Sequence, residues 1–154
     1  MTEPSDDARA AALALSRTAR MLEQALARDT TSGLSLSDYR LLTAVAGGEG
    51  RASRLARRLA VGKPSVSASV ESLVRRGLLA RSAGIADQRA TDLTVTSHGH
   101  TVLADADRAV AGLVSDIADR TPRPGATLSA LAAFGVALEQ RQSEIAARRA
   151  EGRA

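Results

Sequence analysis

Apolar side chains recur at alternating spacings of three and four residues in two long stretches on either side of the chain's centre. The first stretch covers residues 8–29 and the second covers residues 97–119. This spacing places the apolar side chains on one face of a helix, so we expect a helix in each stretch. The apolar positions are Ala12, Leu15, Ala19, Leu22 and Leu26 in the first and Leu103, Ala106, Val110, Leu113 and Ile117 in the second.

Two further helices are predicted by the same pattern and by the residues at their ends. One runs from about Ser37 to Ala46, with Ser37 as its N-cap and Gly47 and Gly48 after its last turn. The other covers roughly residues 126–149 and begins after Pro122 and Pro124. Helices therefore bracket the centre of the chain.

The centre is predicted to hold two shorter helices joined by a turn. Residues 51–59 form the first, and Pro64 opens the second, which ends near Arg76. In the second helix Val66, Val70 and Leu73 share one side, so the serine-rich remainder faces outward. This pattern is typical of a helix-turn-helix whose second helix fits a DNA major groove, although many helix pairs look alike.

A hairpin is predicted directly after this pair of helices. Gly77 ends the second helix, Leu78–Ser82 and Thr91–Val95 are candidate strands, and residues 84–90 form the loop between them. A hairpin in this place is a wing, and Arg89 near its tip would reach the adjacent minor groove, where the negative potential attracts a guanidinium group. The expected fold is mainly α with a small β-hairpin wing.

Basic residues are concentrated in this central segment. Residues 51–90 hold nine Lys or Arg and two acidic residues, a net charge of +7, whereas the remainder has 12 basic and 15 acidic residues. A module that binds phosphates would show this asymmetry, since neutralising phosphates releases counterions. A solvated, arginine-rich helical face is the alternative interpretation.

Composition excludes several other classes. The chain has no Cys, and it has only one Tyr and one Phe as aromatics, so thiolate metal sites and base-stacking platforms for single strands are absent. His98 and His100 are two residues apart and point in opposite directions on a helix, so we expect no metal and no cofactor. With no nucleophile motif and no phosphate loop, we expect no enzyme. With no signal sequence and no membrane span, we expect a cytoplasmic protein.

At the level of motifs, the chain resembles the MarR family of winged-helix transcriptional regulators. Five short segments carry the resemblance, and they occur in the order that the family shows. The fourth segment is a D-x-R element, and the fifth is a variant of L-T-x-x-G in which Val95 replaces Leu. The segments are Leu55-Ala56-Arg57-Arg58-Leu59, Pro64-Ser65-Val66-Ser67, Leu73-Val74-Arg75-Arg76-Gly77-Leu78-Leu79-Ala80-Arg81, Asp87-Gln88-Arg89 and Val95-Thr96-Ser97-His98-Gly99.

The resemblance implies one domain over residues 1–154, with a winged-helix DNA-binding module at about 35–96 and dimerisation helices at about 8–30 and 97–149. It implies a homodimer on a pseudo-palindromic operator in double-stranded DNA, with half-sites about 10 to 10.5 bp apart. The DNA-binding residues it implies are Pro64, Ser65, Ser67, Ala68 and Ser69 on the recognition helix, Asp87, Gln88 and Arg89 on the wing, and Arg54, Arg57, Lys63, Arg75 and Arg76 at the DNA backbone. Ala68 departs from the family, which often has Arg there, so direct reading of guanine gives way to hydroxyl contacts, methyl packing on thymine and groove shape.

Homodimerisation is also predicted by the narrow apolar stripes of the terminal helices, which suit a partner helix; an intramolecular bundle is the alternative. The candidate dimer residues are Leu15, Leu22, Leu26, Leu131, Leu138 and Ile145. Members of the family commonly act as repressors that release DNA when a small molecule binds, and Arg17, Arg20, Tyr39 and Arg40 are candidates for such an effector pocket. Two alternatives stay open: a winged-helix module that binds a protein, and a DNA-binding protein with no effector.

Overall fold

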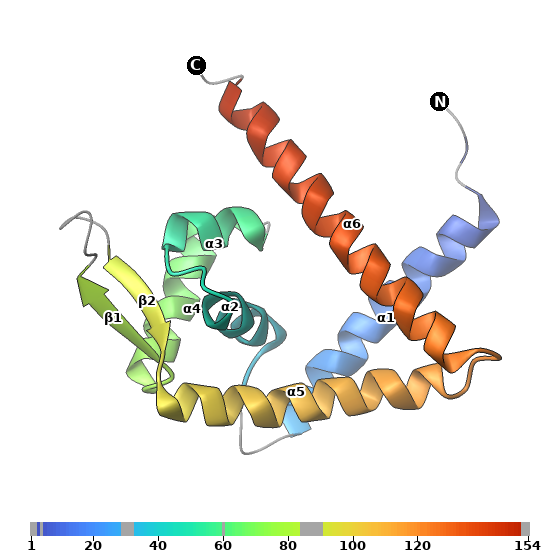
Figure 1. Ribbon diagram of the computed structural model, residues 1–154, viewed down its shortest axis with the longest axis horizontal. Coiled ribbons are helices and arrows are strands. Elements are labelled where there is room, and N and C mark those ends of the chain that lie inside the picture. Colours follow the sequence, from blue (N-terminus) through green and yellow to red (C-terminus); the bar gives the residue numbers. More distant parts are fainter. Residues whose placement is uncertain (1–2, 4, 29–32, 60, 84–90, 152–154) are drawn as a thin grey trace.

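The protein is mainly helical, with one small antiparallel hairpin, as predicted. A computed structural model describes residues 3, 5–28, 33–59, 61–83 and 91–151 (Figure 1). The elements are α1 (Asp6–Arg28), α2 (Leu36–Ala46), α3 (Ala52–Arg58), α4 (Lys63–Arg75), β1 (Leu79–Ala83), β2 (Thr91–Val95), α5 (Ser97–Ala118) and α6 (Pro124–Glu151). No helix within these ranges is long and apolar enough to cross a membrane.

The start of α2 corrects one prediction. Ser35, not Ser37, is the N-cap: its backbone is extended, and its side chain accepts a hydrogen bond from the amide of Asp38 at 3.0 Å. Ser37 is the second residue of α2, whereas the N-cap is the residue that precedes the first helical one. Both serines satisfy the sequence preference for an N-cap, and only the backbone geometry distinguishes them.

One core joins the central helices, the hairpin and the first turns of α5. Leu41 and Leu42 of α2, Leu55 of α3 and Leu73 of α4 are almost fully buried in it, and Leu26 reaches it from the end of α1. Figure 1 shows these central elements grouped around the left half of α5, with α4 behind α2. This group is the winged module, defined here as α2, α3, α4, β1 and β2.

The hairpin is anchored to the loop before α3. β1 and β2 pair antiparallel, with Leu79 opposite Val95 and Ala83 opposite Thr91. At the other edge of β2, Arg51 forms a bridge with Asp92, and the amide of Leu93 donates to the carbonyl of Gly50 at 2.9 Å. The hairpin is therefore held on both sides of β2, which fixes its direction relative to α3.

Three helices form an arm that extends from the module. α5 runs from the hairpin along the base of the molecule, and α6 folds back from its far end (Figure 1). α1 packs against α5 and crosses α6 in this view. Two of these helices, α1 and α6, carry exposed apolar side chains, which include Leu13, Leu15, Met21, Leu128, Leu131, Phe134, Val136, Leu138 and Ile145. In this chain the arm is thus incompletely buried.

A glycine allows α5 to begin directly against the hairpin. Thr96 caps α5, accepting from the amide of Gly99 at 2.9 Å, and its hydroxyl donates to the carbonyl of Gly77 at 2.6 Å. A Cβ on Gly99 would collide with the carbonyl oxygen of Leu78 and would lie 2.8 Å from Cγ1 of Val95. Only glycine fits this approach, which joins the arm to the wing.

Tyr39 links α2 to α5 by a side-chain hydrogen bond. Its hydroxyl donates to Oδ1 of Asp107 at 2.8 Å. Burial, followed by this hydrogen bond and the charge of Asp107, raises the pKa of Tyr39 from 10.0 to about 12. The neutral phenol is therefore the form that the fold stabilises.

Gly99→Ala should destabilise the protein by about 2–3 kcal/mol, because the new methyl group meets backbone that cannot move without displacing the hairpin. Gly112→Ala, in the same helix, is the matched control, since a Cβ there meets nothing within 4 Å and alanine gains about 0.5–1 kcal/mol in helix propensity. Thermal unfolding of both variants checks this. Equal melting temperatures would contradict the close approach.

The pKa of Tyr39 predicts a loss of stability in alkaline solution. The folded-state pKa exceeds the unfolded value, so this contribution is complete below pH 10 and disappears as pH rises from about 10 to about 12. Because Tyr39 is the one tyrosine and the chain has no Trp, phenolate absorbance reports this group alone. We expect a midpoint near 12 in the folded protein, a lower midpoint in Asp107→Asn, where burial still raises the pKa, and a midpoint near 10 in denaturant. An unshifted midpoint in the wild type would exclude the hydrogen bond to Asp107.

Candidate nucleic-acid interface

α4 has one buried side and one exposed side. Val66, Val70 and Leu73 are buried in the core, as the sequence predicted. The opposite side exposes Pro64, Ser65, Ser67 and Ala68, with Ser69 half-buried at the boundary. The five positions that were predicted to contact the bases therefore lie together on one face of small residues.

Turn geometry sets the direction of α4. Gly62, with extended backbone, precedes the helix, and its carbonyl accepts from the amide of Val66 at 3.2 Å. At the other end Gly77 adopts a φ of +70°, and the amide of Leu78 returns to the carbonyl of Leu73 at 2.9 Å. This left-handed cap turns the chain directly into β1. α4 and the hairpin thus form one continuous unit.

The predicted backbone-contacting arginines fall into two groups. Arg54, Arg57 and Arg75 are exposed, and none forms an ion pair within the part of the chain that the structure describes. By contrast, Nη1 of Arg76 lies 4.0 Å from Oδ2 of Asp38 on α2. The side chain of Lys63 lies outside the described residues.

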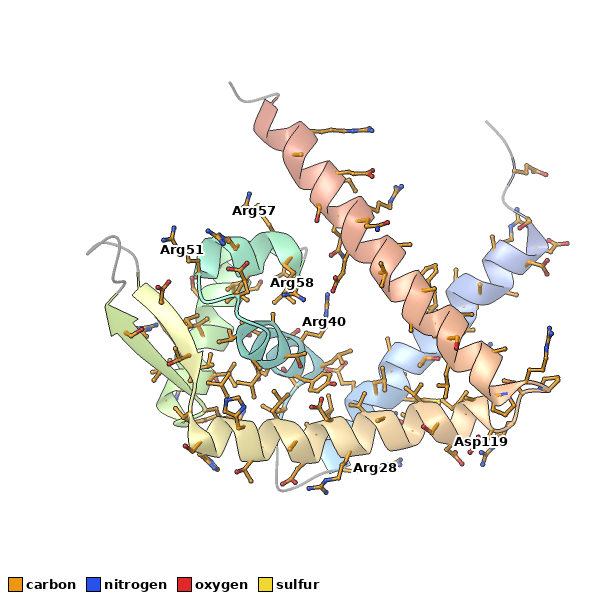
Figure 2. All side chains as sticks on the ribbon, viewed as in Figure 1. Arg28, Arg40, Arg51, Arg57, Arg58 and Asp119 are labelled. Carbon is orange, nitrogen blue, oxygen red and sulfur yellow. The ribbon has the colours of Figure 1, made fainter. Side chains whose placement is uncertain are left out.

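Two arginines that the sequence prediction left out border the same surface. Arg51 pairs with Asp92 at 3.9 Å at the hairpin edge, and Arg58 pairs with Glu139 of α6 at 3.5 Å. In Figure 2 the side chain of Arg57 projects away from the module, whereas that of Arg58 points toward α6. The contact of Arg58 with α6 joins residues 81 positions apart, and no spacing rule could have revealed it.

The wing residues Asp87, Gln88 and Arg89 lie outside the described residues. The strands that lead to them are described, and the side chain of Arg81 on β1 is exposed. The role of Asp87, Gln88 and Arg89 at the DNA therefore stays a prediction.

The four effector-pocket candidates are not gathered around one cavity. Arg17 and Arg20 are exposed on α1. Tyr39 is engaged by Asp107, and Nη2 of Arg40 donates to the carbonyl of Leu59 at 3.3 Å. Two clefts occur among the described residues, and neither is lined by any of these four side chains. One, of about 460 Å³, lies between the loop before α3 and β2, and the other, of about 360 Å³, lies between α3 and α6.

Within the described ranges, no group of three His, Cys, Asp or Glu side chains could hold a metal ion. His98 and His100 are exposed on the first turn of α5, and His100 borders the larger cleft.

The predicted dimer residues differ in exposure. Leu15, Leu131, Leu138 and Ile145 are exposed, and Leu22 is half-buried. Leu26 is fully buried in this chain's own core, because the last turn of α1 packs against the module. It is thus unavailable to a second chain in this arrangement.

Comparison with known sequences identifies one family. Residues 32–90 match the model of the MarR family. These residues include α2, α3, α4 and β1. No curated protein matches the sequence significantly.

Solved structures resemble the chain over most of its length. Wild-type MarR from E. coli, in its apo form, is 18% identical with a TM-score of 0.71, covering 86% of this chain and 98% of that one. CouR from Rhodococcus jostii RHA1, bound to p-coumaroyl-CoA, is 16% identical with a TM-score of 0.72, covering 88% and 92%. The M. tuberculosis regulator MOSR, in complex with DNA, is 22% identical with a TM-score of 0.61, covering 86% and 95%.

These likenesses extend beyond the matched segment to the helices of the arm. They confirm the resemblance seen in the motifs: this chain carries a MarR-family segment at residues 32–90 and has the winged-helix fold of the MarR-family transcriptional regulators.

Proposed function

We propose that this protein is a transcriptional regulator that binds double-stranded DNA as a homodimer and represses the genes beside a pseudo-palindromic operator. The observation that carries the proposal is the exposed face of α4, which is lined by small, mostly polar residues and bordered by arginines that form no ion pair with any described residue. A helix of 13 residues is about 20 Å long and fits the major groove.

The residues on this face suggest how bases are read. Serine hydroxyls can donate to or accept from base edges, and the methyl group of Ala68 can pack on the methyl group of thymine. Arg54, Arg57 and Arg75 would bind phosphates, which orients the helix and supplies affinity without sequence preference. Arg89 would enter the minor groove from the wing.

The exposed apolar side chains of the arm support the homodimer. Leu131, Phe134 and Leu138 of α6 are each 45–53% exposed, and Leu13 and Leu15 of α1 are similarly uncovered. Apolar surface of this extent on helices is typical of an interface. A second copy would cover it and would place two recognition helices on successive turns of DNA, which requires a two-fold operator.

A small-molecule effector is the natural regulator of such a dimer. CouR, which shares the fold, was solved with p-coumaroyl-CoA. An effector that binds one arrangement of module and arm more tightly would shift the population and release DNA. Effector binding and DNA release can be coupled in this way if the whole chain forms one domain. The shared core of module and arm, at Leu26 and the first turns of α5, supports a single domain. A module that binds a protein through the face of α4 is the competing function, and unspecific DNA binding would favour it.

Ala68→Glu should abolish specific DNA binding while leaving the fold intact. The position is exposed, so folding does not oppose the substitution, but a carboxylate there meets the negative groove. We expect at least a tenfold loss of affinity for the duplex that the wild type enriches from random sequence, consistent with about 1–3 kcal/mol for a disrupted base contact.

Ala111→Glu, on the exposed face of α5, adds the same charge and is the control for that experiment. Binding titrations at two salt concentrations measure both variants. Equal affinities for Ala68→Glu and Ala111→Glu would remove α4 from the interface.

Leu131→Glu should weaken the homodimer, because it places a charge within the apolar face of α6. Gln140→Glu, on the same helix, adds the same charge at an exposed polar position. Sedimentation equilibrium should show a dimer for Gln140→Glu and a concentration-dependent shift toward monomer for Leu131→Glu. A full-strength dimer in both would place the interface elsewhere.

A further inference from the structure

Arg75 and Arg76, which the sequence assigns together to DNA phosphates, lie in different surroundings. Arg75 is the last residue of α4, seven residues after Ala68, so it shares the exposed face of the helix. Arg76 follows the helix and turns its guanidinium group back toward α2, where Asp38 lies. Two adjacent cations thus serve two different surfaces.

We infer that Arg76 is a positioning residue: its contact with Asp38 sets the angle of α4 and the start of the wing against α2, and it binds no phosphate. The inference rests on the proposed DNA-binding function and names a residue that determines the geometry of that surface.

The partner of Arg76 is held in place and is largely shielded. Asp38 lies in the first turn of α2, and its amide is fixed by Oγ of Ser35 at 3.0 Å. The side chain of Asp38 is only 15% exposed and that of Arg76 is 33% exposed, so water screens this pair less than it screens the other ion pairs among the described residues. A carboxylate at this end of a helix also gains from the helix dipole.

The surroundings of the guanidinium group confirm its direction. Gly33, which precedes α2 with a φ of +52°, lies so that a Cβ on it would be 3.6 Å from Nη2 of Arg76. The guanidinium group therefore lies over the segment that leads into α2. From there it reaches across to a helix that itself packs on both α4 and α5.

The position of Arg76 in the chain explains why this contact matters for geometry. Arg76 is the C-cap of α4; its amide donates to the carbonyl of Ser72 at 3.0 Å, and the next residue is the left-handed Gly77 that leads to β1. A side chain fixed at this point restrains both the recognition helix before it and the hairpin after it. Loss of the contact would let both move relative to α2.

The test compares wild type, Arg75→Gln, Arg76→Gln and Asp38→Asn on the duplex that the wild type enriches from random sequence, over a range of salt concentrations. A lost phosphate contact flattens the plot of log affinity against log salt by about 0.9, or about 1.8 for both protomers of a dimer. We expect this change for Arg75→Gln. For Arg76→Gln we expect an affinity loss of about fivefold with the slope unchanged.

Asp38→Asn distinguishes the two roles most sharply. Removing a negative charge near DNA would raise affinity if only long-range charge mattered, whereas loss of the positioning contact lowers affinity. We expect a decrease, as for Arg76→Gln, and a loss in the double variant that is smaller than the sum of the two single losses, because both substitutions break the contact between Arg76 and Asp38. Circular dichroism and thermal melting confirm that each variant is folded, and Arg76→Met, which also removes the charge but keeps a long apolar stem, replaces Arg76→Gln if the latter unfolds.

A flattened slope for Arg76→Gln, an affinity gain for Asp38→Asn, or additive effects in the double variant would each overturn the positioning role. Failure of the wild type to enrich any duplex is a different result: it contradicts the proposed function itself.

Discussion

The burial of one side of α4 is the constraint on which the rest of the arrangement depends. Val66, Val70 and Leu73 enter the same core as Leu41, Leu42 and Leu55, and each fully buried aliphatic side chain contributes roughly 1.5–3 kcal/mol. Because these three side chains lie on one side of the helix, burying them leaves the small residues of the opposite side exposed. The face that could read DNA is therefore a direct consequence of how the core forms.

The module and the arm are joined by contacts of different character. The close approach of Gly99 to Leu78 is steric and rigid, and the hydrogen bond from Tyr39 to Asp107 joins a half-buried tyrosine to an exposed carboxylate. The ion pair between Arg58 and Glu139 is exposed and contributes little energy. In the effector-controlled regulator proposed above, a firm joint near the wing and weaker contacts farther along the arm would let ligand binding shift one part against the other.

Local patterns in the sequence were sufficient to predict the helices, the hairpin and the inward side of α4. The spacing of apolar residues, the positions of glycines and the frequency of β-branched residues are all local properties of the chain. They can therefore be read directly from the sequence. Residue type alone does not distinguish Ser35 from Ser37, so the N-cap of α2 is visible only in the structure. The different surroundings of Arg75 and Arg76, and the pairing of Arg58 with Glu139, arise from packing between distant elements. No spacing rule encodes such contacts, and the same holds for the burial of Leu26 in its own chain.

The central claim is that the exposed face of α4 lies in the major groove of a two-fold DNA site. Dimethyl sulfate methylates guanine N7, which lies in the major groove, so protection from it reports occupancy of that groove directly. On the duplex that the protein enriches from random sequence, the account predicts two clusters of protected guanines about 10 bp apart. Tight binding that leaves guanine N7 equally reactive throughout the site would contradict it.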